Sequence, residues 1–222
     1  MKVTHLYHSG CLVELDDHIL LFDYYQGELN LDPNKPLYVF ASHSHQDHFT
    51  ESVFDIRHPY ITYIFSSSVP KTFPALYLDA NQTYKMHDMT IKTLLSTDEG
   101  CAFIVEVEGK TIYHAGDLNW WHWEGEPEES NEYQKETYQQ QINLIHQPVD
   151  VAFVVVDKRQ EKDYTLGLSY FLKNVECRYV FPIHYFGEYS ISDELEKEEL
   201  DNPYQAQIIS VKHPQQEWEI SF

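Results

Sequence analysis

The 222-residue sequence lacks the long apolar run that a membrane-spanning helix requires. No uninterrupted stretch approaches the roughly 20 apolar residues needed to cross a bilayer. Residues 1–5 also lack the charged head and apolar stretch of a secretory signal. We therefore expect a protein that is neither membrane-bound nor secreted.

Cysteine is scarce as well. The three cysteines, Cys11, Cys101 and Cys177, are far apart and form no Cys-x-x-Cys pair. An odd, scattered set argues against a disulfide framework and fits a reducing compartment, so we expect a cytoplasmic protein. Each cysteine lies in or beside an apolar run, which is typical of a small buried hydrophobic residue.

Positive charge is under-represented. The chain has 15 Lys and Arg residues against 36 Asp and Glu residues, which gives a formal net charge of -21. Such a surface repels phosphate backbones, so we expect no binding to nucleic acid or to anionic membranes. We expect a small-molecule substrate instead, and an anionic one is allowed because metal charge can dominate a site. The sequence does not exclude a homo-oligomer.

What the sequence does contain is typical of one folded domain. Hydrophobic residues make up 42% of the chain, and no linker-like stretch or repeat divides residues 1–222. The first half reads as strands and turns, and in the second half strands alternate with helices. This order predicts an α/β fold in which helices pack on the outside of sheets. We expect strands at residues 11–15, 18–24, 37–41, 61–65, 83–95, 102–107, 111–114, 151–156, 179–183 and 217–222. We expect helices at residues 50–57, 131–146, 164–173 and 192–200, the last capped by Ser192.

The most distinctive stretch follows the apolar run at residues 37–41 and reads Ser42-His43-Ser44-His45-Gln46-Asp47-His48. Side chains two apart on an extended chain point the same way, so His43 and His45 can hold one metal ion. Asp47 and His48 follow at the next turn and can face a second ion. Neutral imidazole and carboxylate are ligands for zinc, and also for manganese or iron.

Two other apolar runs end at metal-type ligands. Asp117 follows the run at residues 111–114, and His184 follows the run at residues 179–183. Strand ends on one side of a sheet gather ligand groups in open α/β folds. Asp117 offers two oxygens, enough to bridge two ions, and His184 would complete the shell of the second. The structural alternatives are a turn at Asp117 and a hydrogen-bonded histidine at position 184.

The histidine cluster is harder to explain as purely structural. Three histidines and one aspartate fall within six residues, directly after a predicted buried strand. Leaving these groups unpaired in a packed site would cost several kcal/mol through desolvation. The cluster therefore predicts a metal site.

The pattern His43-x-His45-x-Asp47-His48, followed by Gly116-Asp117 and then His184, resembles the metallo-β-lactamase fold superfamily. The resemblance spans most of the chain. His8-Ser9-Gly10 and His114-Ala115-Gly116-Asp117 are similar to the branch that contains the ascorbate-6-phosphate lactonase type and uncharacterised metal-dependent hydrolases. The resemblance implies a four-layer αββα sandwich with one or two divalent metal ions at one edge of the two sheets.

The sequence departs from the family pattern in one place. The family has another histidine ligand on the first metal, between the cluster and the Gly-Asp pair, but residues 95–100 contain no histidine. Either Asp98 substitutes as an oxygen ligand, or the first site is short of a ligand. Oxygen in place of nitrogen would shift the preference toward a harder ion such as manganese.

The resemblance also implies roles for residues near the metals. Asp47 would orient the nucleophile and move its proton. His114 and His8 would donate hydrogen bonds to the substrate or the transition state, unless both are structural. Asp23 would support a histidine ligand from behind. Residues 120–123, Trp-Trp-His-Trp, form either an apolar wall for a substrate or a loop packed back on its own domain.

The function expected from these residues is metal-dependent hydrolysis of a small ester, lactone, amide or phosphodiester by metal-activated water. Zinc is the expected ion, with manganese or iron as alternatives. Two other functions stay open: a metal-binding module without catalysis, and iron-dependent redox chemistry on the same fold.

Overall fold

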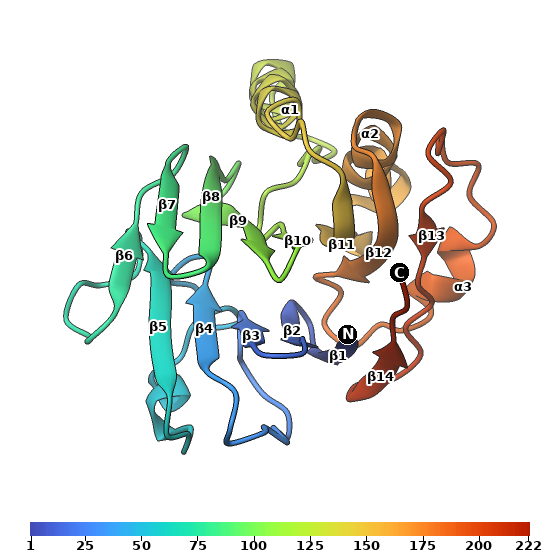
Figure 1. The fold of residues 1–222 in the computed structure, drawn as a ribbon. Helices are drawn as coiled ribbons and strands as arrows, with labels where there is room; N and C mark the ends of the chain where they lie inside the picture. Colours follow the sequence, from blue (N-terminus) through green and yellow to red (C-terminus); the bar gives the residue numbers. More distant parts are fainter.

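The computed structural model describes residues 1–222 and contains two seven-stranded sheets that face each other (Figure 1). The first sheet has the spatial order β14 (Gln216–Glu219), β1 (Lys2–Tyr7), β2 (Gly10–Glu14), β3 (Ile19–Phe22), β4 (Leu37–Ala41), β5 (Ile61–Ser66) and β6 (Leu76–Leu78). The second has the order β13 (Gln207–Ile208), β12 (Cys177–Ile183), β11 (Val149–Val155), β10 (Lys110–His114), β9 (Cys101–Val107), β8 (Met89–Leu95) and β7 (Thr83–Met86).

Each sheet has an antiparallel part and a parallel part. Strands β3 to β6 run parallel in the first sheet, and β10 to β13 run parallel in the second. Because parallel strands end at the same edge, the segments that follow β3, β4, β10, β11 and β12 can meet at one edge of the sandwich.

The helices lie mainly on the second sheet. Figure 1 shows α1 (Glu128–Ile142) and α2 (Leu166–Asn174) on the side of this sheet that faces away from the first. The short α3 (Ile191–Leu195) lies near β13. The outer face of the first sheet packs against the 3-10 helix η1 (Glu51–Asp55) and loops. The predicted α/β sandwich is confirmed.

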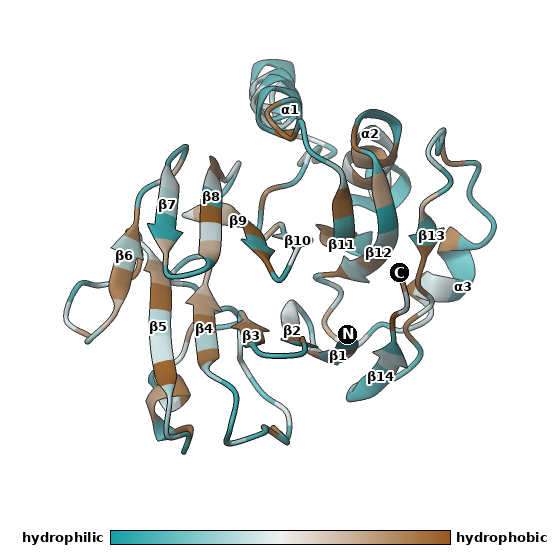
Figure 2. Ribbon diagram, viewed as in Figure 1, coloured by the Kyte–Doolittle hydropathy of each residue, from teal (hydrophilic) through white to brown (hydrophobic).

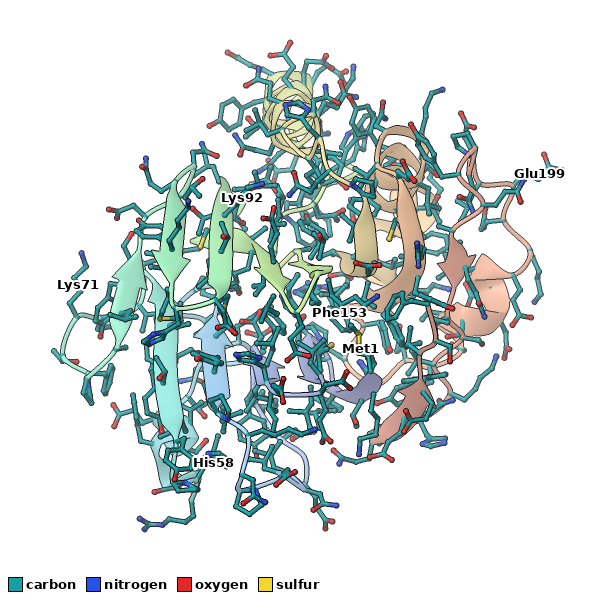
Figure 3. The ribbon with its side chains drawn as sticks, viewed as in Figure 1. Met1, His58, Lys71, Lys92, Phe153 and Glu199 are labelled. Carbon is teal, nitrogen blue, oxygen red and sulfur yellow. The ribbon has the colours of Figure 1, made fainter.

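Alternating side chains on the central strands explain the layers. In β3, Leu20 and Phe22 point into a core of 50 buried residues between and around the sheets, whereas Ile19 and Leu21 point into a separate cluster on the outer face. Phe22 lies 6.3 Å from Phe153 of β11, measured between ring centroids, and Figure 3 shows Phe153 between the two sheets. Figure 2 shows hydrophobic residues concentrated on the strands, while α1 is mostly hydrophilic.

Most predicted elements are confirmed, and a few need correction. Residues 83–95 do not form one strand, because the chain turns at His87, whose φ is 53°, and makes the hairpin of β7 and β8. Ser192 does not cap a helix: it lies inside α3, and its hydroxyl donates a hydrogen bond to the Val211 carbonyl at 2.7 Å. Strands β1, β6 and β13 were not predicted. None of the helices combines the length and apolar character needed to span a bilayer.

Candidate metal centre

The histidine cluster follows Ser42, which two hydrogen bonds hold in place at the end of β4. The backbone N–H of Ser42 donates to Asp23 Oδ1 at 2.8 Å, and its hydroxyl donates to Asp23 Oδ2 at 2.7 Å. Asp23 follows β3, the strand beside β4, and is fully buried. These two hydrogen bonds hold the turn that carries residues 43–48 against the neighbouring strand end.

Two glycines let other loops approach this turn. Gly100 has a φ of +74°, and a Cβ there would lie 1.9 Å from the Ser42 carbonyl oxygen. Gly116 has a φ of +53°, and its Cβ would lie 2.5 Å from Ser42 Cβ. Glycine adopts such backbone angles without steric cost. The loops that carry Asp98 and Asp117 can therefore close on the cluster.

Asp117 lies at the centre of the site. Its Oδ1 is 3.1 Å from His48 Nε2 and 3.3 Å from His184 Nε2, and its Oδ2 is 3.5 Å from His43 Nε2. All four side chains are buried. The structure thus brings three predicted histidine ligands, from two strand ends, around the carboxylate of Asp117 at a third.

The other two predicted ligands border this group and are more open to solvent. His45 Nδ1 lies 3.0 Å from His43 Nε2, and Asp47 Oδ2 lies 3.9 Å from His48 Nε2. With His8 and Asp98, the six predicted ligands form three overlapping sets, and within each set the donor atoms lie within 4.8 Å of one another. The sets are His8, Asp47, His48 and His184; His43, His48 and Asp117; and His45, Asp98 and Asp117.

Asp98 lies where a ligand could replace the absent histidine. Its Oδ2 is 3.9 Å from His45 Nδ1, and both side chains are about half-exposed. The neighbouring Thr97 is buried, and its hydroxyl donates to the Asn119 carbonyl at 2.6 Å. The Thr97 hydroxyl is thus already bonded, and the carboxylates of this loop that approach His45 are Asp98 and Glu99, the latter with its Oε2 3.3 Å from His45 Nε2.

Unpartnered buried atoms show that the site fits a cation. His48 Nε2 and Asp117 Oδ1 are both buried without a hydrogen-bond partner, although they are 3.1 Å apart. A buried polar atom without a partner costs about 1–3 kcal/mol. A divalent ion would satisfy both the imidazole nitrogens and the carboxylate oxygens.

The charges agree with this fit. Burial would raise the pKa of Asp117, but the neighbouring His184 and His48 hold it well below its ordinary value. Burial would lower the pKa of His184, but Asp117 and Asp157 raise it to about 9. The pKa of His48 is likewise raised, against the effect of burial, by Asp117 and Asp23. The carboxylates thus favour positive charge at this place, which protons or a metal ion can supply.

Two buried carboxylates orient the central histidines. Asp23 Oδ2 lies 2.8 Å from His48 Nδ1, and Asp157 Oδ2 lies 3.0 Å from His184 Nδ1. A hydrogen bond at Nδ1 leaves Nε2 facing Asp117 and fixes the ring. The role of Asp23 was predicted, whereas Asp157 was missed. Its signal was available, because Asp157 follows the apolar run at residues 151–156.

His8 lies beside Asp47. Its Nδ1 accepts the backbone N–H of Phe186 at 3.2 Å, so the neutral ring carries its proton on Nε2. That atom lies 3.2 Å from Asp47 Oδ2. His8 therefore holds Asp47 in place.

His114 is fully buried and does not line the cavity. Its Nδ1 accepts the backbone N–H of Gly116 at 3.1 Å, and its Nε2 faces the Ser9 carbonyl at 2.9 Å. Both ring nitrogens are thus occupied by the backbone. The structure gives no support for the predicted catalytic role of His114.

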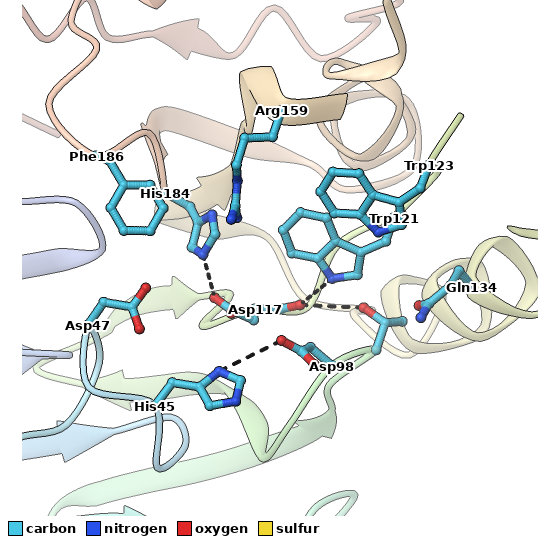
Figure 4. Close-up of a pocket in the computed structure, with 11 residues that line it drawn as sticks. His45, Asp47, Asp98, Asp117, Trp121, Trp123, Gln134, Arg159, His184 and Phe186 are labelled. Atoms are coloured by element: carbon cyan, nitrogen blue, oxygen red, sulfur yellow. Dashed lines mark hydrogen bonds and ion pairs between the residues drawn. The ribbon is translucent and has the colours of Figure 1, made fainter. Parts of the chain in front are cut away.

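A cavity of about 370 Å³ opens above Asp117 (Figure 4). Trp121 and Trp123 stack on each other along one wall, with ring centroids 5.6 Å apart and an interplanar angle of 6°. Trp120 does not line the cavity, so the tryptophan loop is only partly the wall that was predicted. The full lining comprises His45, Asp47, Thr97, Asp98, Asp117, Trp121, Trp123, Gln134, Arg159, His184 and Phe186.

Known proteins are similar to this chain in sequence or in fold. A protein of Carboxydothermus hydrogenoformans, named a UPF0173 metal-dependent hydrolase, is 26% identical over 83% of this chain and 84% of its own. Igni18, a metallo hydrolase of Ignicoccus hospitalis, superimposes with a TM-score of 0.68 at 16% identity, over 99% of both chains. A putative metal-dependent hydrolase of Parabacteroides distasonis gives a TM-score of 0.63 at 16% identity, over 93% of this chain and 90% of its own.

The predicted resemblance to the metallo-β-lactamase fold superfamily is confirmed by the match to a family model. A family model for a beta-lactamase superfamily domain matches residues 2–184, from the first strand to the last of the central histidines. The chain therefore belongs to the beta-lactamase superfamily domain family.

Proposed function

We propose that this protein is a metal-dependent hydrolase of a small ester, lactone, amide or phosphodiester. The observation that carries the proposal is the buried Asp117 carboxylate at the base of the cavity, with the Nε2 atoms of His48 and His184 within 3.3 Å of it. The names of the relatives from Carboxydothermus hydrogenoformans and Ignicoccus hospitalis support the same class of reaction.

The residues available for metal binding form two halves around Asp117. His43, His45 and Asp98, which are linked by contacts of 3.0 and 3.9 Å through His45, would hold one ion. Asp47, His48 and His184 would hold the other. When bound, a divalent ion lowers the pKa of water from 15.7 to about 7 and withdraws charge from the developing oxyanion. We expect zinc in the second half. An oxygen ligand from Asp98 would favour a harder ion such as manganese in the first.

Asp47 is the group that would accept a proton from the attacking water. It is partly exposed, it lines the cavity, and its Oδ2 faces His8 Nε2 at 3.2 Å. This contact with His8 restrains the carboxylate rotamer, so that one oxygen stays directed toward the cavity. Positioning of this kind removes part of the entropic barrier to the reaction.

The substitution of both first-half histidines tests the proposal. In the double variant His43→Ala/His45→Ala, we expect the bound metal to fall and hydrolysis of 4-nitrophenyl esters, aryl lactones and bis(4-nitrophenyl) phosphate to be lost. Exposed His146, outside the site, provides the matched control His146→Ala. Elemental analysis, release of 4-nitrophenol and, for the lactones, release of acid are the measurements. Full activity in the double variant would contradict the proposal.

The same measurements separate the other two functions. Metal content well below one ion per chain, without turnover of any substrate, would favour a binding module. Stoichiometric iron together with oxygen consumption would favour redox chemistry.

A further inference from the structure

Arg159 is the one Lys or Arg among the eleven residues that line the cavity. Its side chain is 57% exposed, so that a ligand can reach it. The remaining charged lining residues include three aspartates, and the whole chain carries a net charge of -21. Arg159 therefore places a positive charge in an otherwise acidic cavity on an acidic protein.

The guanidinium is held on one side by Asp157. Its Nε lies 2.9 Å and its Nη2 lies 2.5 Å from Asp157 Oδ2, and Asp157 also accepts the backbone N–H of Arg159. These bonds leave Nη1 without a hydrogen-bond partner within the protein. Figure 4 shows Arg159 pointing into the pocket beside His184 and Trp121.

Aromatic rings hold the guanidinium from other sides. Its central carbon lies 5.3 Å from the Phe186 ring centroid and 6.0 Å from that of Trp123. A planar guanidinium that is paired and packed in this way loses little further freedom when it binds an oxyanion. The guanidinium is thus held in place, with its Nη1 free to bind a ligand.

We propose that Arg159 determines substrate specificity by binding an anionic group, a carboxylate or a phosphate, on a small substrate whose scissile bond lies over Asp117. This inference rests on the proposed hydrolase function. Hydrogen bonds between an arginine and an oxyanion are charge-assisted and stronger than neutral ones. Trp121, Trp123 and Phe186 would contact the apolar part of the same substrate.

A purely positioning role is the alternative. Arg159 also supports Asp157, which in turn orients His184. If that were its only role, its loss would slow the hydrolysis of charged and neutral substrates by the same factor. If Arg159 instead recognises an anion, its loss would slow hydrolysis of the charged substrate more than that of the neutral one.

The kinetic test uses the metal-loaded full chain and two matched esters: mono-4-nitrophenyl glutarate, with a free carboxylate, and its terminal methyl ester. We expect the wild type to have a higher kcat/KM for the charged ester. In Arg159→Gln the charged-to-neutral ratio should fall about 10-fold or more. Arg159→Lys should recover part of it. Arg178→Gln, at an exposed arginine outside the cavity, should leave it unchanged.

A binding measurement keeps the inference testable if neither ester is hydrolysed, an outcome that would count against the hydrolase function alone. Quenching of tryptophan fluorescence would give Kd values for benzoate and phenyl phosphate on metal-loaded protein. The Kd of at least one should rise about 10-fold in Arg159→Gln, and the ligand with the larger rise distinguishes carboxylate from phosphate. An unchanged ester ratio, or equal Kd values in wild type and variant for both anions, would overturn the inference.

Discussion

Asp157 Oδ2 lies 3.0 Å from Nδ1 of His184, so this buried carboxylate directs the opposite nitrogen of the ring toward Asp117. The two residues follow neighbouring parallel strands, β11 and β12. Asp23 and His48 repeat the arrangement in the first sheet, at 2.8 Å. Each sheet thus supplies one oriented histidine together with its supporting carboxylate.

Removal of the Asp157 carboxylate should weaken metal binding. Groups that orient a metal ligand contribute about 10–100-fold to metal affinity, so we expect Asp157→Ala to raise the metal Kd by that factor. Competition with a chromophoric chelator measures it. The exposed Asp55 provides the control Asp55→Ala, which should bind metal like the wild type. Equal Kd values for Asp157→Ala and wild type would show that His184 needs no support.

Metal removal should lower the melting temperature, because the buried groups around Asp117 lose their partner. At a free metal concentration 100 times Kd, binding stabilises the folded state by about 2.7 kcal/mol. For a chain of this size that corresponds to roughly 5–10 °C in Tm. Calorimetry with and without a chelator measures the shift. The shift in Tm should be the same in His146→Ala and smaller in His43→Ala/His45→Ala. An unchanged wild-type Tm in the presence of the chelator would refute the prediction.

Asp98 should decide how many ions the chain holds. Its carboxylate lies 3.9 Å from His45, in the loop where the family places a histidine, and it shares a ligand set with His45 and Asp117. We expect Asp98→Ala to move the metal content of purified protein toward one ion per chain. Asp98→His should raise the share of zinc, since imidazole is a softer ligand than carboxylate. Elemental analysis provides both values, and the same ion count in Asp98→Ala and wild type would exclude a ligand role.

Gly100 should be far more sensitive to substitution than Gly109, although their φ angles are +74° and +68°. A Cβ at Gly109 meets no atom within 4 Å, so Gly109→Ala should cost only the left-handed backbone strain of about 1–2 kcal/mol. A Cβ at Gly100 would lie 1.9 Å from the Ser42 carbonyl oxygen. Overpacking adds to the strain, so we expect a loss of at least about 3 kcal/mol. Urea denaturation measures both, and equal losses would show that the loop moves freely away from Ser42.

The sequence by itself determined the strands and where the polar groups leave them. Runs such as residues 37–41 and 179–183 are apolar throughout, which predicts buried strands, and the following ligand-type residues are covalently tied to the strand ends. The parallel arrangement then brings His43, Asp117 and His184 to one edge. These features depend on local composition and on chain connectivity, and the sequence displays both.

Only the tertiary structure decided which groups are partners. Asp157 and His184 are 27 residues apart, and His8 meets Phe186 across 178 residues. No periodicity encodes such pairs, because they depend on how two sheets stack and how loops pack. For the same reason, the sequence predicted a catalytic His114, whereas the fold encloses its ring between Gly116 and Ser9. The fold likewise placed Arg159 in the cavity wall, beside His184 and Trp121.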